Sequence, residues 1–373
     1  MRKLIWTLVI LVVVGVFGGR AWWLYQHRET DTNVVKIGVL SYMSGAHATL
    51  GHDFVKGATL AKDEFNKENK TVKLVLDIED SKTDAKTSIF AFNKMLFDKI
   101  QAAIIVGDIP VQAILPIIEE HTIPTIVSIA GGSEFLSEKQ NKLLLKNWPS
   151  IRFMGAYLGR YANETLGLKR VAILSSHNQY GLESAKGFKN GYPTSVVAEE
   201  QFKIDSNELK SQVAKIAYTN PDGIYLTGFG RGYIVALKNI KEQLPGITIL
   251  TDTTVLNPET KENISDLSKI YFVNSVYKDN TKTFEAFKKE YVQAFKEEPT
   301  LFSAYGYDAM RMITKAMGKG VSNQNIHNGF QSLNSIETFA GNLTVLPDGD
   351  CKLPLMIGKM KADGTYDILE ERE

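Results

Sequence analysis

Short apolar runs alternate with longer segments of helical periodicity from residue 34 onward. Residues 36–40 form a short β-rich run, and residues 102–106 are wholly apolar. Between such runs, residues 54–67 repeat apolar side chains at helical spacing. Parallel strands are covered on both faces, so their runs are apolar without alternation. The pattern therefore predicts parallel βαβ units and an α/β fold.

The strand-and-helix alternation occurs twice, over residues 36–129 and again over residues 171–251. This repetition predicts two doubly wound, Rossmann-like α/β lobes with a ligand cleft between them, outside the carboxyl ends of the strands. The strand-and-helix alternation does not continue to the end of the chain. Its predicted elements are two helices and a β-hairpin with one further strand: 283–296, 302–319, 342–361 and 366–369.

The N-terminus carries an apolar segment behind Arg2 and Lys3. Residues 4–19 hold no charge, and extending the segment to Tyr25 adds only Arg20. A signal peptide core is ~7–15 residues and a membrane span is ~20. We expect residues 1–33 to be a signal peptide or uncleaved signal anchor with a polar tether. The absence of a clear small-residue cleavage motif favours an anchor in the inner (cytoplasmic) membrane, with the rest of the chain periplasmic or otherwise extracytoplasmic.

Composition excludes several classes of protein. With 44% hydrophobic and 23% charged residues, the chain is neither disordered, collagen-like nor a polytopic membrane protein. Its formal charge of +1 lacks the basic footprint of a nucleic-acid binder. The single cysteine, Cys351, excludes an intramolecular disulfide, and the histidine spacing indicates no metal site. Without a nucleophile elbow or a Walker A motif, we expect neither an enzyme nor a bound cofactor.

Four features at predicted strand ends are candidates for binding. Residues 228–232 are glycine-rich and open a helix, but the pattern is not a complete G-x-G-x-x-G; the alternative is a helix start whose N–H groups face a polar partner. Asp108 and Asp252 each follow a strand and could either cap the next element or point into the cleft, and capping is favoured for Asp108. Tyr180 could seal a cleft or cover a helix end.

Taken together, the order and spacing of several motifs resemble the branched-chain amino acid-type periplasmic substrate-binding proteins of ABC importers, which have the type I periplasmic-binding fold. The resemblance covers about residues 34–368. The motifs that carry it are 37–45, Gly51, Gly57, Gly107 with Pro116, 123–128, 179–181, 304–309, 339–344 and 348–350.

That resemblance implies a three-strand hinge, closure on a small solute without covalent chemistry, and an ABC permease as partner. The crossovers between lobes are expected near 148–151, 277–279 and 335–337. The first lobe then comprises residues 34–150 and 279–335, and the second comprises residues 151–278 and 336–373.

Carrying the family's binding positions onto this sequence exposes departures. The two hydroxyl donors for a ligand carboxylate fall at Val111 and Gly132, although Ser133 could substitute, and the acidic position falls at Thr253, beside Asp252. Losing a charge-assisted donor usually costs ~1–3 kcal/mol. The two losses argue either that an ordinary α-amino acid is not the ligand or that backbone N–H groups do more of the holding. The expected binding residues are Ser44, Leu50, Gly107, Asp108, Val111, Ala130, Gly131, Gly132, Ser133, Tyr180, Phe229, Asp252 and Thr253.

Two functions follow from the resemblance. The first is a solute-binding protein of an ABC importer that takes a small amino-acid-like or less polar solute, such as an aromatic acid, an amide or a peptide-like compound. The alternative is a non-transport sensory or protein-contact envelope protein with the same fold.

Overall fold

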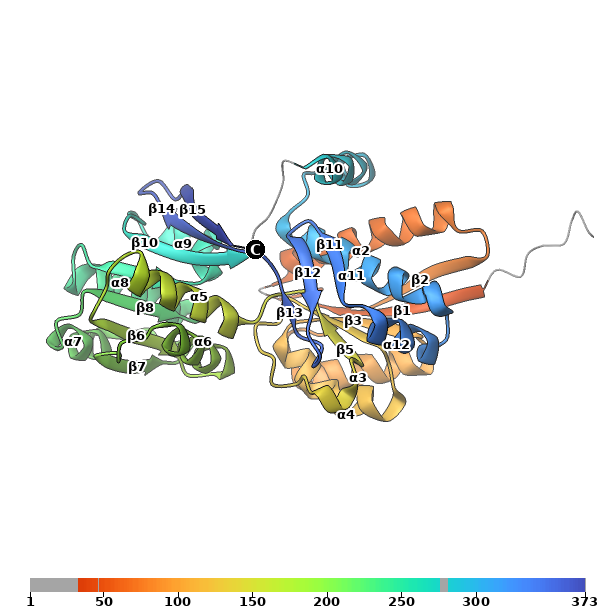
Figure 1. Cartoon of the computed structure of the whole chain (residues 1–373), viewed down its shortest axis with the longest axis horizontal. Helices are drawn as coiled ribbons and strands as arrows, with labels where there is room; N and C mark the ends of the chain where they lie inside the picture. Colours follow the sequence, from red (N-terminus) through yellow and green to blue (C-terminus); the bar gives the residue numbers. More distant parts are fainter. Residues whose placement is uncertain (1–32, 46, 276–280, 373) are drawn as a thin grey trace, which may run out of the picture.

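The computed structural model describes residues 33–45, 47–275 and 281–372, which form two lobes side by side (Figure 1). The first lobe is built on a five-stranded parallel sheet. Its strands follow the order β2-β1-β3-β4-β5. Their bounds are β1 Asn33–Ser41, β2 Val72–Asp80, β3 Ala102–Val106, β4 Thr125–Ser128 and β5 Leu144–Lys146.

Helices cover both faces of the first sheet. Their bounds are α2 Ala48–Glu68, α3 Ala85–Phe97, α4 Asp108–His121, α10 Lys282–Phe295, α11 Leu301–Ala316 and α12 Asn323–Ser332. Helices α2, α11 and α12 pack on one face, and α3 and α4 pack on the other. This two-sided cover explains why the apolar run of β3 is buried at every position.

The second lobe is built on a seven-stranded sheet in the order β15-β14-β10-β9-β8-β6-β7. The strands from β7 to β10 along this order run parallel, whereas β14 and β15 add an antiparallel edge. The bounds are β6 Val171–Ser176, β7 Ala198–Phe202, β8 Gly223–Thr227, β9 Thr248–Thr251, β10 Ile270–Ser275, β14 Leu355–Met360 and β15 Tyr366–Arg372.

Two helix layers enclose this second sheet as well. Its helices are α5 Ile151–Glu164, α6 Gln179–Gly191, α7 Lys210–Tyr218, α8 Gly230–Gln243 and α9 Pro258–Asn263. Helices α5 and α6 share one buried cluster with the sheet, and α7 and α8 share the cluster on the opposite face. Three short 3₁₀ turns complete the described helical segments: η1 Glu138–Gln140, η2 Thr253–Leu256 and η3 Met317–Lys319.

Glycines allow one helix pair in each lobe to pack backbone against backbone. In the second lobe, a Cβ added to Gly191 of α6 would lie 1.9 Å from the backbone oxygen of Ala156 in α5. In the first lobe, a Cβ on Gly57 of α2 would lie 1.8 Å from the backbone oxygen of Ser303 in α11. Both distances are too short for any side chain, so these positions require glycine for close approach.

A small third sheet belongs to the first lobe, which differs from the expected assignment of residues 336–373 to the second lobe. Its antiparallel strands are β11 Ser335–Thr338, β12 Gly341–Val345 and β13 Cys351–Lys352. Leu343, Val345 and Cys351 are buried in the same cluster as the first sheet. The predicted hairpin over 342–361 is therefore split, because β14 pairs with β10 of the second lobe. The chain changes lobe at Leu353 and Pro354, not near 335–337.

Of the other two crossovers, the structure describes the first but not the second. Residues 147–150 connect β5 of the first sheet to α5 of the second lobe, at the place expected for the first crossover. The second crossover, expected near 277–279, lies outside the described residues. The predicted anchor and tether over residues 1–33 also lie outside them except for Asn33, which begins β1 rather than ending a tether. Among the helices that the structure describes, none combines the length and apolar character that crossing a bilayer requires.

The parallel strands of both sheets are connected in the same way, which confirms the prediction of two doubly wound α/β lobes. In the first sheet, β2 lies on one side of β1 and the next strand, β3, lies on the other side of β1. The second sheet repeats this reversal with β6, β7 and β8. Ligands of such sheets bind where the strand order reverses, outside the carboxyl ends of the strands. The loops after β1, β3, β6 and β8 therefore frame the candidate site.

Candidate functional site

On the first lobe, the sharp turn after β3 carries an acidic side chain to the edge of the sheet. Gly107 has a φ of 92°, and a Cβ there would lie 1.5 Å from the hydroxyl oxygen of Tyr42. Only glycine meets both requirements. Asp108 follows as the first residue of α4 and is partly exposed. Burial, followed by the negative charge of Asp108, raises the pKa of Tyr42.

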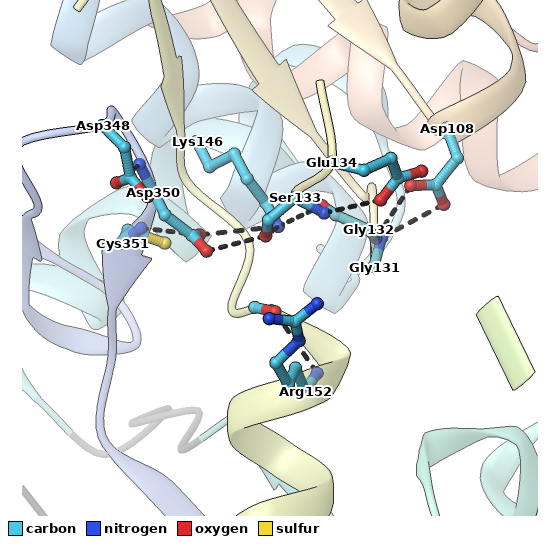
Figure 2. Close-up of polar contacts among 11 residues, drawn as sticks. Asp108, Gly131, Gly132, Ser133, Glu134, Lys146, Arg152, Asp348, Asp350 and Cys351 are labelled. Carbon is cyan, nitrogen blue, oxygen red and sulfur yellow. Dashed lines mark hydrogen bonds and ion pairs between the residues drawn. The ribbon is translucent and has the colours of Figure 1, made fainter. Parts of the chain in front are cut away.

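The Asp108 carboxylate does not cap its own helix, as we had favoured from the sequence. The helix begins after Gly107 with no side-chain cap. Instead, the carboxylate reaches the loop after β4, where it accepts hydrogen bonds from the backbone N–H groups of Gly131 at 3.1 Å and Gly132 at 2.8 Å (Figure 2). Burial raises the pKa of Asp108, and these bonds together with Lys146 oppose the rise.

A second carboxylate occupies the next donor of the same loop. Glu134 accepts a hydrogen bond from the backbone N–H of Ser133 at 3.0 Å and another from the Gln112 amide. Residues 131–133, here termed the amide turn, therefore present three consecutive N–H groups to carboxylates of this same chain. Figure 2 shows Asp108 and Glu134 close together over the turn.

A buried lysine holds the amide turn from behind. Lys146 is 0% exposed, and its Nζ donates to the Gly132 carbonyl at 2.6 Å and to Ser133 Oγ at 3.0 Å. The ammonium also lies 3.5 Å from Oδ1 of Asp350, whose other oxygen accepts the Ser133 hydroxyl at 2.7 Å. Asp350 further accepts the backbone N–H of Cys351 at 2.8 Å. A continuous polar chain thus connects the amide turn to β13 (Figure 2).

On the second lobe, the Tyr180 ring faces the amide turn and packs against Phe229. Tyr180 lies in the first turn of α6, and its ring meets Phe229 edge-on with centroids 5.5 Å apart. A Cβ on Gly131 would lie 2.9 Å from the Tyr180 ring, so the tyrosine packs directly on the backbone of the opposite lobe. The predicted residues of the two lobes therefore meet at Gly131 and Tyr180.

Asp252 is a buried acid that interacts with Tyr180. Its carboxylate is 0% exposed and accepts hydrogen bonds from Thr254 N–H at 2.9 Å and Thr227 Oγ1 at 2.8 Å. It therefore caps η2, which was one of the two roles that the sequence left open. Burial raises the pKa of Asp252 despite these bonds. Burial and then Asp252 raise the pKa of Tyr180.

The remaining predicted residues lie in different environments. Val111 and Ala130 are 0% exposed and pack in the core between the first sheet and helices α3 and α4, so their side chains do not face the cleft as predicted. Leu50 is partly buried against the other core of that lobe. Ser44 is exposed and donates to Asp80 at 2.6 Å. Thr253 is partly exposed at the start of η2.

The glycine-rich segment 228–232 has a packing explanation. A Cβ on Gly230 would lie 2.8 Å from the backbone oxygen of Ile204, and one on Gly232 would lie 2.3 Å from that of Lys203. The Gly232 N–H also donates to the Ile204 carbonyl. The glycines therefore let the start of α8 approach the loop after β7.

A cavity of about 540 Å³ lies elsewhere, between α5 and the strands that lead into and out of the third crossover. Phe153, Tyr157, Leu353 and Pro354 are among its lining residues, and none of the predicted binding residues lines it. Over residues 33–45, 47–275 and 281–372, no group of three or more His, Cys, Asp or Glu side chains is arranged to hold a metal ion.

Four side chains that shape the site were not predicted from the sequence. Tyr42, Glu134, Lys146 and Asp350 all contact Gly107, Asp108 or the amide turn. Lys146 alone carried a usable signal, because it is a single charge at the end of the apolar run 143–145. A lysine in such a run must find buried partners.

Comparison with known proteins identifies the family to which this fold belongs. The family model described as "Periplasmic binding protein" matches residues 34–365. The chain belongs to the periplasmic binding protein family. The expected type I fold is thereby confirmed, and the fold is that of a solute-binding protein.

Relatives of known name are similar over nearly the whole chain. The Leu/Ile/Val-binding protein homolog 1 of Brucella abortus (strain 2308) is 21% identical over 390 aligned positions that cover 100% of both chains. A branched-chain amino acid transporter substrate-binding protein from Streptococcus pneumoniae, solved with isoleucine, superposes with a TM-score of 0.76 at 20% identity, covering 90% of this chain and 99% of that one. An ABC transporter solute-binding protein from R. palustris, solved with 4-hydroxybenzoate, gives 0.78 at 17%, covering 91% and 97%.

Proposed function

We propose that this chain is the extracytoplasmic solute-binding protein of an ABC importer, and that it closes by a hinge on one small organic solute. The observation that carries the proposal is the meeting of the two lobes beside their switch points: Tyr180, which follows β6, packs on Gly131, whose N–H donates to Asp108 in the turn after β3. The named relatives, which include substrate-binding proteins of ABC transporters, support the same role.

In this proposal the binding residues are the predicted set around the amide turn, Tyr180 and Phe229. Tyr180 and Phe229 supply an apolar wall, which suits a solute less polar than an ordinary amino acid. Residues 1–33 tether the protein to the membrane beside its permease. The protein performs no covalent chemistry, because its task ends when the solute is handed over.

The test is a screen of melting temperature with the full-length chain in detergent. The panel comprises aliphatic amino acids, aromatic acids, amides, amines, peptides and sugars. A ligand at 100 times its Kd stabilises by about 2.7 kcal/mol, which raises the melting temperature by a few degrees. We expect one chemical class to do so. No response from any class would contradict the proposal and favour a sensory or protein-contact role.

Point variants then test the location of the site. We expect Tyr180→Ala to weaken solute binding about tenfold, because it removes the aromatic wall next to Gly131. Tyr218→Ala is the matched control, since Tyr218 is 89% exposed at the end of α7. Equal affinity of both variants and the wild type, measured by calorimetry, would remove Tyr180 from the site.

A further inference from the structure

The amide turn has the geometry of an anion site, yet its donors are already used. Three successive N–H groups at the carboxyl end of β4 are typical of a concave turn that binds a carboxylate. Here Asp108 takes the N–H groups of Gly131 and Gly132 through its two oxygens, and Glu134 takes that of Ser133. An incoming carboxylate would therefore find no free donor on this turn.

The hydroxyl of the turn is engaged in the same way. Ser133 Oγ donates to Asp350 and accepts from Lys146. The Lys146 ammonium is 0% exposed and contacts the Gly132 carbonyl, Ser133 and Asp350, so it is not free to donate a hydrogen bond to a solute. Asp108, in contrast, is partly exposed and lies at the edge that faces Tyr180.

A solute with its own carboxylate would meet like charge at this place. It would have to displace Asp108 from two hydrogen bonds of 3.1 and 2.8 Å and then lie beside the displaced acid. A solute that donates N–H hydrogen bonds meets the opposite situation. Carboxylate oxygens have acceptor capacity beyond the bonds used here, and each aromatic face of Tyr180 and Phe229 tolerates an amide or attracts a cation.

We propose that Asp108 is a specificity-determining residue that fills the amide turn as a built-in carboxylate, so that the cleft rejects carboxylic acids and selects a solute whose polar group donates N–H hydrogen bonds. This inference rests on the proposed solute-binding function and names the chemical class of the solute. Primary amides and amines share the required chemistry. The relatives solved with isoleucine and 4-hydroxybenzoate hold carboxylic acids, so this chain departs from them in specificity.

The experiment uses three probes that share one ring and differ in the polar group: benzoate, benzamide and benzylamine. Binding of each to the full-length wild type, Asp108→Ala and Asp108→Asn is measured by isothermal titration calorimetry. We expect no benzoate binding by the wild type, and a gain of at least about tenfold in benzoate affinity for Asp108→Ala. Asp108→Asn, which can still fill one donor, should fall between them.

A matched control removes a different helix-start acid from the same lobe. Asp84 caps α3 by accepting the Thr87 N–H at 2.7 Å and is exposed, so Asp84→Ala loses one charge and one cap without opening the amide turn. We expect its benzoate affinity to equal that of the wild type. Circular dichroism of each variant establishes that it is folded before it is titrated.

Every outcome decides the inference separately from the proposed function. Benzoate binding by the wild type as tight as by Asp108→Ala overturns the inference while supporting solute binding. Failure of Asp108→Ala and Asp108→Asn to gain benzoate binding overturns it as well. The inference is supported if Asp108→Ala gains benzoate affinity and the wild type binds benzamide or benzylamine more tightly than benzoate. Whether benzamide or benzylamine binds then tells whether the polar group of the solute is an amide or an amine. The proposed function fails only if the wider screen finds no solute for the wild type.

Discussion

Asp308 is an acid that the fold keeps in a nearly dry environment. Its side chain is 3% exposed in α11, where it accepts the backbone N–H of Phe339 at 3.0 Å and lies 3.4 Å from a guanidinium nitrogen of Arg311. Burial raises its pKa to about 7, although both contacts oppose the rise. The side chain thereby fixes the turn between β11 and β12 on the first lobe.

The raised pKa of Asp308 predicts a dependence of stability on pH. Unfolded aspartate has a pKa of about 3.9, so between about pH 4 and the folded pKa of about 7 the folded state binds more protons. The contribution of this group to stability is therefore fully present below about pH 4 and is lost as pH rises through 7. We expect Asp308→Asn to flatten the fall in melting temperature across this window.

The control for this prediction is an acid with the opposite shift. Asp363 is exposed, and hydrogen bonds from Thr365 hold its pKa below the usual value. Asp363→Asn should leave the profile above pH 4 unchanged. If Asp308→Asn retained the full wild-type slope between pH 4 and 7, the titration would belong to another group.

At the scale of elements, the glycine contact between α5 and α6 allows a direct test. Gly191→Ala places a methyl group 1.9 Å from the backbone oxygen of Ala156, and the helices must separate to admit it. We expect the free energy of unfolding to fall by about 1–3 kcal/mol, as for overpacked cores. Urea unfolding followed by circular dichroism measures the loss.

Another glycine of the chain provides the comparison. A Cβ on Gly318 meets no atom within 4 Å, so Gly318→Ala should be neutral or slightly stabilising. Equal effects of the two substitutions would mean that α5 and α6 are not held together by this backbone contact.

The elements also show where sequence reasoning succeeded and where it could not. The predicted strands 102–106 and 223–227 coincide with β3 and β8. A strand that is buried on both faces is mostly apolar along its whole length, so its bounds can be recognised in the sequence. The hairpin over 342–361 was wrong, because local alternation does not say which sheet a strand joins.

The same distinction holds for the candidate site. Tyr180 was predicted from the end of a strand, and Gly131 was predicted from the binding positions that the family resemblance implies. The two hydrogen bonds that Asp108 accepts from residues 131–132 could not be predicted from the sequence, because they depend on β3 and β4 being neighbours in space. A carboxylate at a helix start satisfies the capping pattern equally well, so the pattern alone favoured the wrong partner.

At the scale of the whole molecule, the single cysteine makes hinge closure measurable. Cys351 is 0% exposed, and burial raises the pKa of its thiol, so it should resist thiol reagents. Thr49→Cys and Arg231→Cys place exposed thiols in the first turns of α2 and α8, one on each lobe. In the labelled double variant we expect energy transfer between fluorophores to rise when the solute identified in the screen is added.

The labelling experiment carries its own control for motion within a lobe. A pair confined to the second lobe, Arg231→Cys with Tyr218→Cys, should show no change on adding the same solute. Constant transfer in the pair that spans both lobes, under conditions where calorimetry shows saturation, would contradict closure of the hinge.

The late position of α11 and of β11 to β13 affects how the chain acquires its structure during synthesis. Helix α2 is synthesised early, but its Gly57 packs on the backbone of Ser303, which is synthesised much later. The core of the first lobe also includes the late residues Leu343 and Cys351. Most of the second lobe, in contrast, is contiguous from α5 to β10. The lobe that leaves the ribosome first therefore completes its core after most of the other, and until then its apolar sheet face stays available to chaperones or to the export machinery.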